Sequence, residues 1–191
     1  MKIAILAWGS LLWQPKDLHF NEEIGWSENG PFLPIEFARI SKDGRLTLVI
    51  TQNGTEVKTY FAISNYDNLE EAVLNLAVRE SSGRGQIGSY DKSESTFSQE
   101  VFFKNNILEW INSTDIDAVI WTNLGEKWNF KDDNSGLSGT IIPNERIDYL
   151  QSLKGNKSAL AEEYIRRTPL QIQTHWRNLI DKELGWIPII K

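Results

Sequence analysis

Apolar residues follow strand-like patterns in the first half of the chain and helical spacing in its last third. Residues 3–8 form an unbroken apolar run, IAILAW, which ends at Gly9 and Ser10. A short continuous apolar run bounded by turn residues is typical of a strand that is covered on both faces. We therefore predict a buried first strand that is followed by a turn.

Three further apolar segments predict an antiparallel meander. The segments 33–40 and 46–50 flank Asp43-Gly44, and an Asp-Gly pair between apolar runs is a strong hairpin signal. After a turn at Gln52-Asn53-Gly54, the segment 57–64 alternates side chains between two faces. This alternation indicates a third strand that continues the meander.

Helical spacing begins near Asp67, which is the expected N-cap because Glu70 follows at the capping-box distance. Leu69, Val73 and Leu76 then form an apolar stripe with steps of four and three residues. For the rest of the chain we expect a Gly/Ser-rich loop at 81–95, a helix at 97–112, a buried strand at 117–122 and helices across 144–185.

These elements predict one α+β domain that spans residues 1–191. Its core, residues 1–125, would hold a mostly antiparallel or mixed sheet, or a small barrel, with flanking helices. Residues 144–185 would form a helical C-terminal extension. No repeat or linker interrupts the chain.

Composition narrows the function classes. The net charge is −6 and no basic block is present, so nucleic-acid binding is not expected. The chain has no cysteine, which excludes disulfides, thiolate metal sites and a cysteine nucleophile and fits a cytoplasmic protein. The two histidines lack metal-ligand spacing, and no apolar run is long enough to span a bilayer. We expect no metal, no cofactor and no membrane partner.

Glu80 is the first candidate for chemistry, because it extends the apolar stripe of the helix that begins near Asp67. A carboxylate on the core side, at a helix C-terminus, breaks the binary pattern, and both placements disfavour its charged form. Such a carboxyl group suits proton transfer. The alternative is that the helix has reached the surface, where Glu80 is solvated or paired with Arg79 or Arg84.

The turn Trp8-Gly9-Ser10-Leu11 is the second candidate. Glycine at a strand end allows close backbone approach to a ligand, and free N–H groups in a turn bind anions. The alternative is a plain strand-to-loop corner. Glu36 and Arg39 are a third candidate pair. They fall on opposite faces of a strand, so one of them should point inward and need a partner, unless both lie on an exposed face.

The order of these motifs resembles the gamma-glutamylcyclotransferase-like family. The segment AWGSLLW after the first strand looks like the family's Tyr-Gly-Ser-Leu turn, with Trp8 where tyrosine is usual. Strands, a short helix and then a glutamate before a glycine-containing loop follow in the same order. Glu80 matches the family's general acid/base, and Ser81 stands where members often carry glycine. The resemblance covers roughly residues 1–125.

The resemblance implies an enzyme that cyclises a gamma-glutamyl amine or amide to 5-oxoproline and a free amine. The substrate supplies its own nucleophile, so neither a metal nor a cofactor is needed. Glu80 would move the proton, and Trp8, Gly9, Ser10 and Leu11 would bind the substrate. We add Arg39 and Tyr90 as candidate cleft residues. The alternative is a binding module of the same fold, without catalysis, for a small anionic metabolite or a protein partner.

Overall fold

A computed structural model of the protein describes residues 1–128 and 143–189. Internal contacts divide these residues into two compact units. The first unit comprises residues 1–33 and 58–124, and the second comprises 34–57 together with the described part of 125–191. The strands predicted at 33–50 thus group with the C-terminal helices, whereas the sequence analysis placed them with the N-terminal core.

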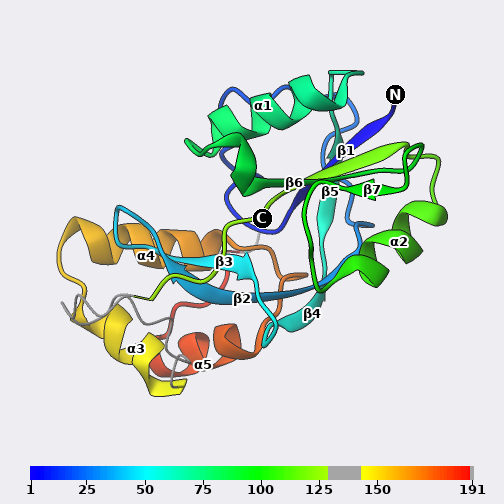
Figure 1. The fold of residues 1–191 in the computed structure, drawn as a ribbon. Helices are drawn as coiled ribbons and strands as arrows, with labels where there is room; N and C mark the ends of the chain where they lie inside the picture. Colours follow the sequence, from blue (N-terminus) through cyan, green and yellow to red (C-terminus); the bar gives the residue numbers. More distant parts are fainter. Residues whose placement is uncertain (129–142, 190–191) are drawn as a thin grey trace. The chain divides into compact units, whose positions relative to one another are not determined.

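The first unit is built on a five-stranded mixed sheet with the order β5-β1-β8-β6-β7 (Figure 1). β1 pairs in parallel with β8 and antiparallel with β5, while β6 runs antiparallel to β8 and β7. The bounds are β1 (Ile3–Ala7), β5 (Tyr60–Ile63), β6 (Ile87–Asp91), β7 (Thr96–Phe97) and β8 (Ala118–Thr122). All five residues of β1 are buried, which confirms the prediction from the run IAILAW.

Helix α1 (Leu69–Arg79) packs its apolar stripe on this sheet. Val73 and Leu76 share one hydrophobic core with Ile5 of β1 and Ile120 of β8. The N-cap is Asn68, whose side chain accepts hydrogen bonds from the amides of Glu70 and Glu71. The prediction of Asp67 as the cap is therefore wrong by one residue. A 3-10 turn, η1 (Arg84–Gln86), and helix α2 (Lys104–Asn112) complete the unit.

The second unit combines a three-stranded sheet of order β3-β2-β4 with three helices. Its elements are β2 (Phe32–Ile40), β3 (Leu46–Ile50), β4 (Thr55–Lys58), α3 (Pro143–Ser152), α4 (Asn156–Arg167) and α5 (His175–Leu184). β2 and β3 form the predicted hairpin, in which Gly44 has a φ of 85°. Only glycine takes this conformation without steric cost.

The α+β class is confirmed, but several finer predictions are wrong. The described strands form two open sheets and close no barrel. The meander is also wrong, because β4 pairs with β2 rather than with β3, and β5 joins the other sheet beside β1. The segment 81–95 is not all loop, since β6 lies within it. The helix predicted at 97–112 begins only at Lys104.

Helices do occupy the C-terminal region, as predicted for 144–185. The interpretation of the chain as a single domain stays a prediction. None of the helices in the described ranges is both long and apolar enough to cross a membrane.

Candidate functional site

Three backbone donors in the turn after β1 have no acceptor among the described residues. The amide of Leu12 bonds to the Gly9 carbonyl at 3.0 Å, and that of Gln14 bonds to the Ser10 carbonyl at 2.8 Å. The N–H groups of Gly9, Ser10 and Leu11 donate no hydrogen bond to any described residue. Gly9 and Leu11 are buried, and buried N–H groups are almost always paired in folded proteins. The turn therefore has the donors that an anion requires.

Glu80 lies at the C-terminal cap of α1, one turn beyond the buried Leu76. Its amide bonds to the Leu76 carbonyl at 3.0 Å, and its side chain is 16% exposed. Oε1 accepts a hydrogen bond from Nη1 of Arg79 at 2.6 Å. Within residues 1–128 and 143–189, Oε2 accepts no hydrogen bond.

Arg79 brings the two candidates together. Its Nη2 donates to Oγ of Ser10 at 3.2 Å and to the carbonyl of Gln14 at 2.7 Å, while Nη1 holds Glu80. One guanidinium group thus spans the distance between the turn and the carboxylate. From its sequence position, Arg79 was expected only as a possible partner of Glu80. The available signal was a cation in the last turn of a helix, next to a carboxylate on the apolar face.

Ser81 follows the C-terminal cap of α1 and lies in the left-handed region, with a φ of 50°. Its amide bonds to the Val78 carbonyl, and that of Ser82 bonds to the Ala77 carbonyl, so the last turn of the helix is closed. A residue with a side chain is strained in this conformation, which glycine adopts readily. The departure from glycine noted at this position therefore carries a conformational cost.

Of the remaining predicted cleft residues, Trp8 belongs to the turn and is buried, at 6% exposure. The other two lie elsewhere. Tyr90 is buried in β6 and packs on Phe97 with ring centroids 4.5 Å apart. No described contact joins Tyr90 to Glu80. Arg39 belongs to the second unit, where its Nη1 donates to the Gly125 carbonyl at 2.8 Å.

Glu36, in the second unit, is the inward member of the pair Glu36 and Arg39, being 1% exposed. It accepts hydrogen bonds from Oγ1 of Thr174 at 2.6 Å and from the amide of Trp176 at 3.3 Å, so it binds the first turn of α5. Burial raises the pKa of Glu36, although these bonds and the Arg146 guanidinium oppose the shift. A carboxylate so enclosed supports the helix and offers no surface to a substrate.

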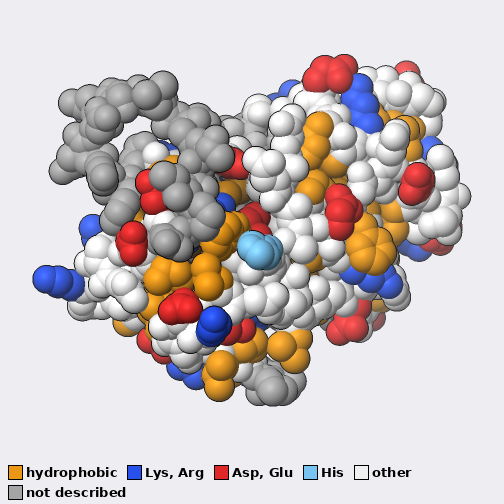
Figure 2. Space-filling view, turned by 90° about the horizontal axis from the view of Figure 1, so that it is seen from below, with side chains coloured by type: hydrophobic (Ala, Val, Ile, Leu, Met, Phe, Trp, Pro, Cys, Tyr) orange, Lys and Arg blue, Asp and Glu red, His pale blue; other side chains and the backbone are white. Residues whose placement is uncertain are grey.

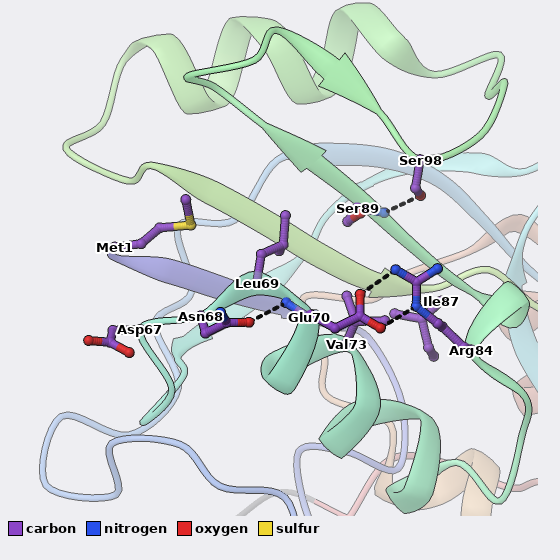
Figure 3. Close-up of a pocket in the computed structure, with 10 residues that line it drawn as sticks. All are labelled: Met1, Asp67, Asn68, Leu69, Glu70, Val73, Arg84, Ile87, Ser89 and Ser98. Carbon is purple, nitrogen blue, oxygen red and sulfur yellow. Dashed lines mark hydrogen bonds and ion pairs between the residues drawn. The ribbon is translucent and has the colours of Figure 1, made fainter.

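A separate pocket of about 430 Å³ lies in the first unit (Figure 3). The ion pair between Glu70 and Arg84 lies along its wall, above the side chains of Val73 and Ile87. The lining residues are Met1, Asp67, Asn68, Leu69, Glu70, Val73, Arg84, Ile87, Ser89 and Ser98. None of the site residues predicted from the sequence is among them.

Comparisons of this chain with protein-family models, with curated proteins and with solved structures found no match.

Among the described residues, no group of three or more His, Asp or Glu side chains could hold a metal ion. Lys and Arg side chains stand apart from one another, interspersed with Asp and Glu, on the face drawn in Figure 2.

Proposed function

We propose that this protein cyclises a gamma-glutamyl amine or amide, with release of 5-oxoproline and a free amine. One observation carries the proposal. Arg79 binds both the Glu80 carboxylate and Ser10, so the proposed proton-transfer group lies next to a turn whose amides at residues 9–11 have no acceptor in the described part of the chain. An acid/base and an anion site in one place are what this reaction needs.

The proposed reaction requires two proton movements. Glu80 takes a proton from the substrate's α-ammonium group, and the freed amine attacks the γ-carbonyl carbon, which forms the C–N bond of the ring. Glu80 passes this proton to the leaving nitrogen as the bond from that carbon to the nitrogen breaks. It then carries the second proton of the ring nitrogen to the same amine, which departs as an ammonium ion and leaves the neutral lactam. One positioned carboxylate serves both steps, and Oε2 has no competing donor among the described residues.

The turn would fix the substrate for ring closure. The amides of Gly9, Ser10 and Leu11 would donate to the substrate α-carboxylate, and Trp8 and Leu11 would form apolar walls. Holding the amine and the carbonyl in a near-attack geometry is the largest gain available to an intramolecular reaction. The positive charge of Arg79 behind Ser10 favours an anion at the same place.

The second candidate is a binding module that has kept the anion site without catalysis. The specific observation in its favour is the ion pair between Arg79 and Glu80, at 2.6 Å, which neutralises the carboxylate. Such a protein would bind a small carboxylate at the turn and leave it unchanged.

The test is incubation with a panel of gamma-glutamyl amines and amides, with 5-oxoproline measured by mass spectrometry. Glu80→Gln should lower turnover by at least about a hundredfold, the usual contribution of an acid/base group. Glu71→Gln is the matched control, because Glu71 lies exposed on the same helix. Full activity of the Glu80 variant would refute its role. Carboxylate binding without turnover on any substrate favours the binding module.

A further inference from the structure

We infer that Arg79 is the positioning residue of this site, an inference that rests on the proposed function. It fixes the Glu80 carboxylate relative to the turn at residues 8–11. Substrate binding and proton transfer therefore depend on one guanidinium group that need not touch the substrate.

Two of the three side-chain hydrogen bonds of Arg79 to described residues go to the site, and the third goes to Gln14, just beyond the turn. Nη1 donates to Glu80 at 2.6 Å, and Nη2 donates to the Ser10 hydroxyl at 3.2 Å and to the Gln14 carbonyl at 2.7 Å. A guanidinium is planar and its donors have fixed directions. The orientation of Oε1 is therefore set by the same group that holds the Ser10 hydroxyl, and no described residue donates a hydrogen bond to Oε2.

Because Arg79 is buried, a gain in folding stability does not readily explain why an arginine occupies this position. The side chain is 5% exposed, whereas that of Arg84, an arginine of the same unit, is 63% exposed. Nε of Arg79 is buried and has no acceptor among the described residues, which is unfavourable. Buried ion pairs are often no more stabilising than apolar residues of similar size. The buried Nε thus carries a cost that a stabilising role alone does not explain, while the bonds to Glu80 and Ser10 order the site.

A purely structural role, tying α1 to the segment 9–14, makes a different prediction. In that case Arg79→Met lowers the midpoint of thermal unfolding and leaves the kcat of the folded fraction unchanged. A positioning role predicts a loss of kcat in protein that is fully folded at the assay temperature.

The experiment measures kcat, KM and the thermal midpoint for Arg79→Met, Arg79→Lys and the control Arg84→Met. We expect Arg79→Met to lower kcat about a hundredfold while KM changes less than about tenfold, the loss typical of a displaced catalytic group. Arg79→Lys should have a kcat between those of Arg79→Met and the wild type, because its ammonium group keeps the positive charge but not the two nitrogen donors with which Arg79 binds Glu80 and Ser10. Arg84→Met should match the wild type. A wild-type kcat in Arg79→Met overturns the inference and leaves the proposed function standing.

If the wild type forms no 5-oxoproline from any gamma-glutamyl compound, the proposed function fails and a second readout decides the inference. Backbone amide NMR signals of Gly9, Ser10 and Leu11 are recorded with and without Glu80→Gln, in the wild-type and Arg79→Met backgrounds. Shifts that appear only when Arg79 is present support the coupling. Equal shifts in both backgrounds, or no shift in either, overturn it.

Discussion

Position 88 has room only for glycine, because Trp121 faces it across the β6–β8 pair. A Cβ atom at position 88 would lie 2.3 Å from Cε2 and 2.4 Å from Nε1 of the indole. Favourable contacts lie at about 3.5–4.0 Å, so the ring would have to retreat by more than about an ångström. Trp121 is fully buried, and Phe97 and Phe103 pack edge-on against it. Retreat is therefore blocked, and Gly88→Ala overpacks the core.

Overpacking of this kind costs about 1–3 kcal/mol. For a chain of this length, about 2–4 °C of thermal midpoint is lost per kcal/mol, so Gly88→Ala should unfold about 2–12 °C below the wild type by circular dichroism. Gly85→Ala is the control, because a Cβ there meets nothing within 4 Å. Trp121→Phe should relieve the clash in the double variant, and it breaks no hydrogen bond to a described residue. Equal midpoints for the two alanine variants would refute the reasoning.

Three further predictions concern caps and charges. Burial raises the pKa of Glu36 above its usual 4.5. Between that value and the raised pKa, the folded state keeps a proton that the unfolded chain releases, so the free energy of unfolding falls as pH rises from about 4.5 through the raised pKa. Glu36→Gln should remove this fall in urea unfolding; parallel pH profiles for the two proteins contradict it. Asn68→Ala should cost about 1 kcal/mol as a lost N-cap, while Asp67→Ala changes little; equal urea midpoints would contradict the cap assignment. Ser81→Gly should stabilise by about 1 kcal/mol by relieving the positive φ, and a lower thermal midpoint argues against strain there.

Sequence patterns predicted those elements whose own residues are apolar enough to indicate that they are buried. The run IAILAW gave β1, the apolar run at 117–122 gave β8, and Asp43-Gly44 gave the β2–β3 hairpin. β6 was missed because IGSYD contains few large apolar residues. Its burial comes from the indole of Trp121, which packs on a glycine far away in the chain. The pairing of β4 with β2 is likewise invisible to any local pattern.

The same division applies to the candidate site. Glycine after a buried strand and a carboxylate on an apolar stripe are local features, so the turn at 8–11 and Glu80 could be singled out. The contact between Arg79 and Ser10 joins residues 69 positions apart, and no spacing rule reports it. Glu36 was recognised as one of two possible inward charges, but its partner Thr174 lies 138 positions away.

The bond between Glu36 and Thr174 also implies that the two units fold at different times while the chain is being synthesised. β2 and β3 emerge early, yet the helices that pack with them in the second unit come only after residue 142. Ribosomes add about 5–20 residues per second. These strands therefore remain without their helices for a time on the order of seconds, and during that time Glu36 is exposed to solvent. The residues of the first unit are all present by residue 124. Nascent chains stalled once residues 1–142 are outside the ribosome should therefore resist protease in the first unit and be cleaved within 34–57; protection of both would contradict this order.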